Sequence, residues 1–352
     1  MADTAPPFPY AGEDVRTLVS APGEVGDLTP ADDEYAAGLR GRVQSLVGLD
    51  VRFGGDHTSV LALRALAAVD RDLERRGIRR RAGRDVRAAV AELAEVTGWL
   101  LCDANRQGPS YRVNRRALEL ARTAGDSSME LFVVHNMSLQ ATYLRRPRTT
   151  LALAAPVLDR GGLTPRLEAM FRLRVARAYA QMGLRTEATR TLAHATGLLS
   201  EGVHDRDPGW AWWVSERGFT HAAGAMLGGL GDWKAAIDPI QRALAAAPPE
   251  AHRERFLYLC VLMHAQLEAG AWRDAEPTAR EIVPLLRTVR SGRPLARLSA
   301  TLDRFHRDGR PPRAARGIVG DLRHAMGGGQ ADHRPPPSPG CGGTGRRRGP
   351  GF

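Results

Sequence analysis

Residues that carry enzyme chemistry are present in the chain, but not at the spacings that catalytic motifs require. Lys234 is the only lysine and follows Trp233, so the Gly-Lys-Ser/Thr sequence of a phosphate-binding loop is absent. The glycines of residues 224–231 are spaced somewhat like a dinucleotide-binding loop, yet no strand pattern precedes them. The Gly-x-Ser-x-Gly turn of serine hydrolases is also absent. We therefore expect neither an enzyme nor a bound cofactor.

Histidines and cysteines are the next candidates for chemistry. His252 and His264 fall on one predicted helix but are twelve residues apart, so they lack the i, i+4 spacing of a metalloprotease helix, and we expect no metal site. Cys102, Cys260 and Cys341 are far apart and form no Cys-x-x-Cys pair. We interpret the first two as buried, inert thiols.

Two polar or aromatic groups have both a structural and a functional interpretation. Trp210, Trp212 and Trp213 would form an interaction hot spot if exposed, but the helical spacing of Trp210 and Trp213 favours packing against preceding helices. Asp103 and Asn105 end a predicted helix, where a capping or turn role is commoner than a functional polar site.

Composition and hydropathy indicate a protein without a membrane segment. The chain has 352 residues, of which 43% are hydrophobic, and no apolar run approaches the ~18 residues that a membrane helix needs. Prolines and acidic residues occupy positions 1–29, where a secretory signal needs basic residues and then an apolar stretch. We expect a cytoplasmic protein with no membrane contact.

The formal net charge of +11 raises the possibility of nucleic-acid binding, but the charge is almost all arginine and indicates GC-rich coding. Charge is also uneven along the chain. Residues 1–37 hold eight acidic residues against Arg16 and are predicted to be a flexible lead-in. Residues 306–352 are rich in Pro, Gly and Arg and are predicted to be disordered. Arg346, Arg347 and Arg348 are interpreted as a solvated tail, with weak phosphate contact as the alternative.

The hydrophobic pattern from Tyr35 onward is helical and shows no alternating strand pattern. Residues 38–84 are predicted to form N-terminal helices, interrupted at Phe53 to Gly55, that cap a longer helical region at 85–305. The sequence therefore predicts an all-α protein. Within the longer region we predict helices at 85–105, 111–124, 128–144, 148–159, 165–182, 186–199, 210–230, 233–246, 251–268 and 272–288.

Three glycines share a spacing that is typical of stacked helical hairpins. Each has an alanine five residues downstream, because a glycine adopts the left-handed turn between two helices and a small residue lets the next helix pack closely. The glycine and alanine pairs are Gly183 and Ala188, Gly231 and Ala236, and Gly270 and Ala275.

This spacing resembles the tetratricopeptide repeat, a 34-residue helix-turn-helix unit. With each glycine at position 15, Ala176 and Gly224 match the small residue at position 8, and Tyr179 matches the tyrosine at position 11. Three units would cover 169–202, 217–250 and 256–289, and a degenerate unit with Arg145 in place of the glycine would cover 131–164. Residues 85–126 form a possible fifth unit. The resemblance implies antiparallel hairpins stacked in a right-handed solenoid.

Three sequence phrases resemble the repeat region of actinobacterial transcriptional regulators that carry a phage-repressor-type helix-turn-helix. They are Gly-Trp-Leu-Leu-Cys-Asp-Ala (98–104), Met-Glu-Leu-Phe-Val-Val-His-Asn-Met-Ser-Leu-Gln-Ala (129–141) and Trp-Ala-Trp-Trp-Val (210–214). The resemblance covers about residues 39–305. Residues 1–39 are too short and irregular for the DNA-binding bundle, so we expect a regulatory module without its own sequence-specific DNA reader.

The repeat resemblance also implies a binding groove lined by the first helix of each unit. Arg177 would clamp a carboxylate of a peptide or protein ligand, while aromatic residues would bury its side chains. The alternatives are a groove filled by its own chain, a plain scaffold, and nonspecific DNA binding through arginines; the oligomeric state is left open. The implied groove residues are Phe132, His135, Leu139, Thr142, Tyr143, Met170, Leu173, Arg177, Gln181, His221, Leu257, Cys260, His264 and Glu268.

Overall fold

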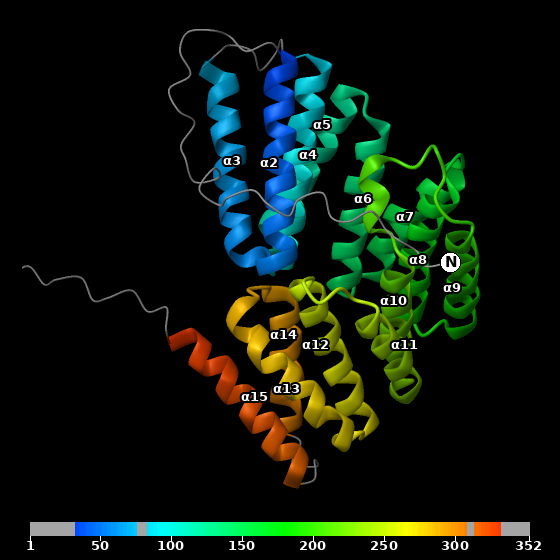
Figure 1. Ribbon diagram of the computed structural model, residues 1–352. Coiled ribbons are helices and arrows are strands. Elements are labelled where there is room, and N and C mark those ends of the chain that lie inside the picture. The colour runs from blue at the N-terminus through cyan, green and yellow to red at the C-terminus, as the bar shows by residue number, and fades with distance from the viewer. Residues whose placement is uncertain (1–31, 76–82, 308–312, 332–352) are drawn as a thin grey trace, which may run out of the picture.

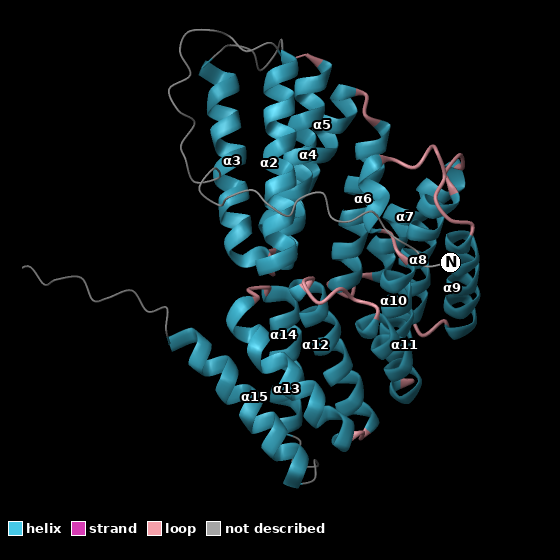
Figure 2. Cartoon of the chain, in the orientation of Figure 1, coloured by secondary structure: helices cyan, strands magenta, loops and turns pink. Residues whose placement is uncertain are grey.

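The computed structural model describes residues 32–75, 83–307 and 313–331. All regular secondary structure in these ranges is helical, and loops and turns join the helices. This part of the chain contains fourteen α-helices, one short 3₁₀ helix and no strand (Figure 2). The predicted all-α class is confirmed. None of the described helices is both long and apolar enough to cross a membrane.

The helices follow one another along a curved array (Figure 1). Their bounds are α2 Asp32–Phe53, α3 Gly55–Arg75, α4 Arg84–Asp103, α5 Gln107–Ala124, α6 Ser127–Tyr143, α7 Pro147–Arg160, α8 Pro165–Gln181, α9 Arg185–Ser200, η1 Gly209–Trp213, α10 Glu216–Gly229, α11 Trp233–Ala245, α12 His252–Ala269, α13 Trp272–Thr288, α14 Gly292–Arg307 and α15 Arg313–Ala331.

Five consecutive hairpins, from α4–α5 to α12–α13, turn in the same way. Gly183, Gly231 and Gly270 have φ of +77°, +86° and +72°, the left-handed conformation that glycine adopts without strain. Asn105 and Arg145 occupy the same place in the two earlier hairpins, with φ of +59° and +54°. The residue five positions after each of these is fully buried at 0% exposure: Ser110, Thr150, Ala188, Ala236 and Ala275.

The hairpins form two layers. The first helices, α4, α6, α8, α10 and α12, pack against one another in chain order, and α12 continues this inner layer to α14. Each first helix also packs against the second helix of its own hairpin, α5, α7, α9, α11 or α13. We call α4, α6, α8, α10, α12 and α14 the inner helices.

The two ends of the array meet. Helix α12 packs against α2, and α14 packs against α4, although these elements are far apart in the sequence. The contact joins helix ends, because the Arg290 N–H donates to the Phe53 carbonyl at 2.7 Å and the Asp56 N–H donates to the Arg290 carbonyl at 2.9 Å. Gly54 lies here with φ of +84°, and a Cβ at this position would come within 2.6 Å of the Arg290 oxygen. The Phe-Gly-Gly break therefore forms a docking point for the C-terminal helices.

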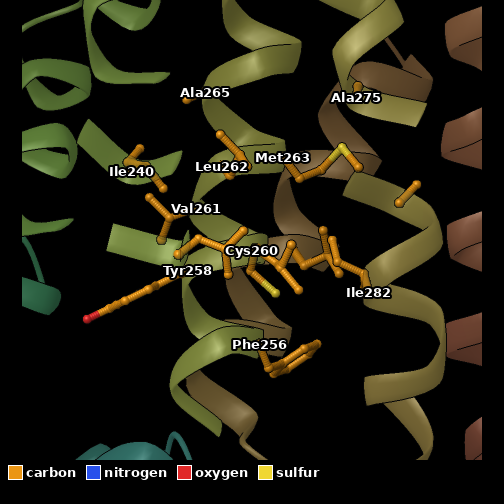
Figure 3. Packing of buried hydrophobic residues seen from close by; sticks show 14 of the residues in the cluster. Ile240, Phe256, Tyr258, Cys260, Val261, Leu262, Met263, Ala265, Ala275 and Ile282 are labelled. Atoms are coloured by element: carbon orange, nitrogen blue, oxygen red, sulfur yellow. The ribbon is translucent and has the colours of Figure 1, made fainter. Parts of the chain in front are cut away.

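The largest hydrophobic core surrounds α12 (Figure 3). Phe256, Leu259 and Met263 are fully buried there, and they pack with Ile240 of α11 and Ile282 of α13. Cys260 is a free, buried thiol on the same helix, and Cys102 is free and buried on α4. Cys341 lies outside the described residues.

The predicted helix at 210–230 is wrong. The segment forms η1 and then α10, because the backbone is extended at Val214 and Ser215 and the Ser215 hydroxyl caps α10 by accepting from the Gly218 N–H at 3.3 Å. Helix α5 also begins earlier than predicted, at Gln107 rather than Tyr111.

The predicted end segments differ from the structure. Helix α2 begins at Asp32, inside the expected lead-in at 1–37, and α15 lies inside the expected disordered tail at 306–352. Val319 and Leu322 of α15 join the core around α12 and α13, which explains how this segment gains a helical structure. Residues Arg346, Arg347 and Arg348 lie outside the described residues.

Candidate binding site on the inner helices

Nine of the predicted groove residues come from four of the inner helices. Helix α6 carries four of them, α8 and α12 carry two each, and α10 carries one. The structure divides them into residues covered by the chain, residues bound to neighbouring helices, and residues beside an arginine cluster. In chain order they are Phe132, His135, Leu139, Tyr143, Arg177, Gln181, His221, His264 and Glu268.

The chain itself covers the first part of the expected groove. Trp210 stacks in parallel on Phe132 with ring centroids 4.4 Å apart, and its indole N–H donates to the Ser128 hydroxyl at 2.9 Å. Trp213 lies 5.2 Å from the ring of His135, which is fully buried. Phe132 and His135 therefore do not form an open surface, and the preferred packing role of these two tryptophans is correct.

The α12 residues contact α14. His264 Nδ1 lies 2.9 Å from the Thr301 hydroxyl, and its ring meets Trp233 edge-on. Glu268 forms an ion pair with Arg304 at 2.6 Å. Leu139 on α6 is half-buried. These side chains connect or pack neighbouring elements of the inner layer.

Residues near the ends of α6 and α8 bond to neighbouring helices. Gln181 Nε2 donates to the Thr142 carbonyl at 2.7 Å, and the Tyr143 hydroxyl donates to the Arg293 carbonyl at 3.3 Å. The second bond joins α6 to the start of α14, 150 positions further along the chain. Arg293 thereby lies over the Tyr143 ring, with the guanidinium carbon 5.7 Å from the centroid.

Arg177 belongs to a group of arginines that form no ion pair with any carboxylate of the described residues. We call Arg174 and Arg177 of α8 and Arg297 of α14 the unpaired cluster. Arg174 and Arg177 are three residues apart, so they share one face of α8. Each repels Arg293, and Arg177 also repels Arg297. The structure thus brings like charges together from two helices that are distant in sequence.

The pKa values of Arg174 and Arg177 in the unpaired cluster are lowered, because these groups are removed from solvent without a neighbouring negative charge. Burial, followed by repulsion from Arg177 and Arg293, lowers the pKa of Arg174 to about 9. Burial and repulsion from Arg297 and Arg293 lower the pKa of Arg177 to about 10. The pKa of His221 falls to about 3 because of burial and the same positive field. His221 is therefore neutral at physiological pH.

Several buried polar atoms around this cluster have no hydrogen-bond partner within the described structure. Arg174 is only 6% exposed, yet its Nε and Nη1 atoms have no acceptor. His221 Nε2 and Gln181 Oε1 are also unpartnered. Buried polar atoms are normally satisfied, so such a group on α8 and α10 indicates a place where another molecule or water supplies the partners.

A second buried charge group lies where the ends of the array meet. We call Asp50, Asp103, Arg253 and Arg293 the closure cluster. Asp103 is fully buried and contacts Arg253 and Arg293, with one carboxylate oxygen 3.4 Å from each guanidinium. Its other oxygen accepts from the Ser291 hydroxyl at 2.5 Å and the Gly55 N–H at 3.1 Å. This carboxylate therefore binds three separate segments together.

The two carboxylates of the closure cluster differ in acidity. Burial raises the pKa of Asp50 to about 6, although Arg253 at 3.1 Å opposes the shift. Burial also disfavours ionisation of Asp103, but Arg253 and Arg293 outweigh it and hold the pKa of Asp103 below its ordinary value. Both guanidinium groups lie 5.4 Å from the ring centroid of Trp99. Trp99 also donates to Asp50 at 3.2 Å.

The sequence reasoning found Arg177 but missed its neighbours. Arg174 lies one helical turn before Arg177, and this spacing was a usable signal. Arg293 and Arg297 fall beyond the last predicted repeat, so nothing in the sequence placed them beside α8. Asp103 was interpreted as a capping or turn residue, whereas its complete burial between two arginines makes it the centre of the closure cluster.

The Asp207 carboxylate accepts from the Thr164 hydroxyl at 2.5 Å and from the His204 N–H at 2.9 Å, so it holds the segment before η1 against the start of α8. Pro147 occupies the first position of α7, where its missing N–H costs no helical hydrogen bond.

No protein-family model matches the chain, and no curated protein shows a significant match. Function therefore has to be inferred from the geometry of the inner helices.

Proposed function

We propose that the protein is a tetratricopeptide-like helical module, with its hairpins stacked in a right-handed solenoid, that binds a peptide segment of a protein partner. The recurring left-handed turn and the buried small residue five positions later support the repeat assignment, because both recur in all five hairpins. The inner layer of first helices is the surface that such repeats use for binding.

The observation that carries the binding proposal is the convergence of unsatisfied polar groups from different inner helices. Arg174 offers two unpartnered donor atoms on α8, and His221 and Gln181 offer further unpartnered atoms on α10 and α8. An unsatisfied buried polar atom costs about 1–3 kcal/mol, so these groups favour a partner that can hydrogen-bond to them. A ligand that bonds to them would recover this cost.

A regulatory role is proposed from the sequence phrases at 98–104, 129–141 and 210–214, which resemble repeat regions of transcriptional regulators. The role would be cytoplasmic and non-enzymatic, with the module acting through its ligand. We propose that the regulated process is transcription.

A peptide-array screen on the full-length chain tests the binding proposal. Peptides that bind wild-type protein should lose at least ten-fold in affinity for Arg177→Met and retain affinity for Arg172→Met. Arg172 is the matched control because it lies on the same helix, pairs with Glu168 at 2.6 Å and is part of neither buried cluster. If no peptide discriminates between these two variants, the inner helices are not the binding surface and the protein is a plain scaffold.

A further inference from the structure

A further group of buried polar atoms without hydrogen-bond partners comes from α6, α8 and η1. It consists of Nε2 of His135, Nε1 of Trp213, and Nε and Nη1 of Arg174. His135 is 0% exposed and Arg174 is 6% exposed. Buried polar atoms are normally hydrogen-bonded, so four such atoms on three elements call for a partner that the described residues do not supply.

Ring contacts place two of these side chains against each other. The centroid of the His135 ring lies 5.2 Å from that of the Trp213 ring, and the two ring planes are tilted by 38°. His135 Nε2 and the Trp213 indole N–H are nevertheless not bonded to each other. A third group that bonds to both ring nitrogens would satisfy the two of them at once.

Helix spacing brings Arg174 to the same place. Phe171 of α8 meets the His135 ring edge-on, with centroids 6.0 Å apart. Further along α8, the Gln181 amide donates to the Thr142 carbonyl of α6 at 2.7 Å. These two contacts define the face of α8 that packs on α6. Arg174 lies on this face, one turn after Phe171 and between the two contacts, so its buried guanidinium belongs to the α6–α8 interface beside His135.

The hydrogen bonds behind His135 assign the proton on its ring. The Asn136 amide nitrogen donates to Glu95, which leaves the Asn136 Oδ1 atom to face His135 Nδ1 at 3.3 Å. Because this oxygen is an acceptor, Nδ1 carries the hydrogen and Nε2 is left as an acceptor. Burial, followed by the positive charge of Arg174, lowers the pKa of His135 well below its ordinary value, so the ring is neutral at physiological pH.

The unbonded atoms therefore comprise three N–H donors and one acceptor. Arg174 supplies two of the donors and keeps its positive charge, because arginine does not lose its proton in proteins. Glu95, at the far end of the network, brings no negative charge at neutral pH, since burial raises its pKa to about 8. A partner that satisfies every atom must be negatively charged, accept hydrogen bonds and donate one.

We infer that α6, α8 and η1 enclose a binding site for a small oxyanion that keeps a hydroxyl group, such as bicarbonate or hydrogen phosphate. Its oxygen atoms accept from Arg174 and Trp213, and its hydroxyl donates to His135 Nε2. Nitrate, sulfate and halides have no hydrogen to donate. Water has one but leaves the buried charge of Arg174 uncompensated. This inference does not rest on the proposed function, because the ligand is a free ion beneath η1 and not a peptide.

The first test compares anions on the full-length chain at neutral pH and constant ionic strength, by titration calorimetry and melting temperature. Bicarbonate or phosphate should raise the melting temperature by about 5 °C at one hundred times its Kd. Nitrate and sulfate, which match the shapes of bicarbonate and phosphate without the hydrogen, should bind at least ten-fold more weakly. A response to only one of the two hydroxylated anions identifies the ligand. Equal affinity for an anion and its matched control, or binding of neither hydroxylated anion, would overturn the inference.

The second test removes the indole N–H. Trp213→Phe keeps an aromatic ring beside His135 and should weaken binding of the responding anion at least ten-fold. Trp210→Phe is the matched control, because it makes the same change in η1 at an indole whose N–H already donates to the Ser128 hydroxyl at 2.9 Å. The control should retain wild-type affinity. Equal effects of the two substitutions would overturn the site.

The third test removes the acceptor. His135→Phe keeps a ring between Phe171 and Trp213 but has no atom that accepts a hydroxyl hydrogen. The wild-type preference for the hydroxylated anion over its matched control should disappear in this variant. A preference that persists would overturn the role of His135. If the variant does not fold, the anion comparison on wild-type protein decides the inference.

A last pair of variants separates this site from the peptide surface. Arg174→Met should abolish binding of the responding anion, whereas Arg177→Met, which tests the peptide proposal, should leave its affinity within two-fold of wild type. Equal loss of anion binding in both variants would place the anion on the peptide surface and overturn the enclosed site. Failure of every peptide to bind, with anion binding intact, would overturn the proposed function alone.

Discussion

The closure cluster and the unpaired cluster are both built from buried or half-buried arginines, but only the closure cluster contains acidic partners. Arg253 lies 3.1 Å from Asp50 and 3.4 Å from Asp103, while Arg174 and Arg177 face only other positive groups. Paired charges hold two distant parts of the chain together. Unpaired charges weaken the fold around them, so they point to a partner that comes from outside.

The largest expected effect concerns Asp103. Replacing it by Asn keeps the shape but removes the charge that faces Arg253 and Arg293, and leaving a buried ion without its partner costs about 3–5 kcal/mol. The free energy of unfolding, measured by urea denaturation, should fall by that amount. Asp159→Asn, on the exposed part of α7, should change it by less than about 0.5 kcal/mol. Equal effects would show that the closure cluster does not hold the ends together.

Glu95 shows what happens when a buried group without an opposite charge is able to become neutral. It is 2% exposed, accepts a bond from the Asn136 amide, and burial raises its pKa to about 8 from 4.5. Because the folded-state pKa is raised, the protonated form is favoured by folding, and stability decreases as pH rises from 4.5 to about 8. Glu95→Gln should remove a slope of about 1.4 kcal/mol per pH unit.

The measurement for Glu95 is the free energy of unfolding between pH 5 and 8 for both proteins. Other groups contribute equally to each, so the difference between the two curves isolates Glu95. A constant difference across this range would mean that the carboxyl is already ionised in the folded protein. The unpaired arginines cannot neutralise themselves in this way, which is why they need an external counter-charge.

Substitution in the unpaired cluster should stabilise the free protein. Arg174→Met removes a buried, uncompensated charge and keeps most of the side-chain volume, so the free energy of unfolding should rise by about 1 kcal/mol. The same variant should lose ligand affinity. Denaturation in ligand-free buffer measures the first effect, and a decrease in stability would place Arg174 with the structural arginines.

The smallest expected effect is that of Asp50→Asn. Burial raises the pKa of Asp50 to about 6, so its ionised form contributes less than that of Asp103, and stability decreases as pH rises from 3.8 to about 6. Asn retains an acceptor for the Trp99 indole N–H. We expect a change below about 1 kcal/mol at pH 7. A loss as large as that of Asp103→Asn would mean that both carboxylates are equally needed for closure.

Local spacing predicted the all-α class and the positions of most helices, and the reasons are visible in individual residues. Gly183, Gly231 and Gly270 marked three hairpins because glycine is the usual residue at φ near +75°. Asn105 and Arg145 adopt the same conformation without that signal, so their hairpins were assigned less clearly.

The site was only partly predictable, because its residues come together through long-range contacts. Arg177 was found from its place in a predicted repeat. Arg293 and Arg297, whose charges lower the pKa of Arg177, lie on α14, which packs against α4 because the last helices return to the first ones. The sequence favoured packing of Trp210 but did not identify Phe132 as its partner, because η1 is separate from α10 and packs against α6.

The hydrogen bond from the Gly292 N–H to the Asp56 carboxylate, 3.0 Å long, joins residues 236 positions apart. An open array of repeats behaves nearly as a one-dimensional chain, in which terminal units fray first and each unit is stabilised only by its neighbours. Joining the two ends gives each terminal unit a second neighbour, so neither end can unfold without breaking a contact made by the other. We expect the array to unfold as one cooperative unit and to fold slowly, because its last contact closes a loop of most of the chain.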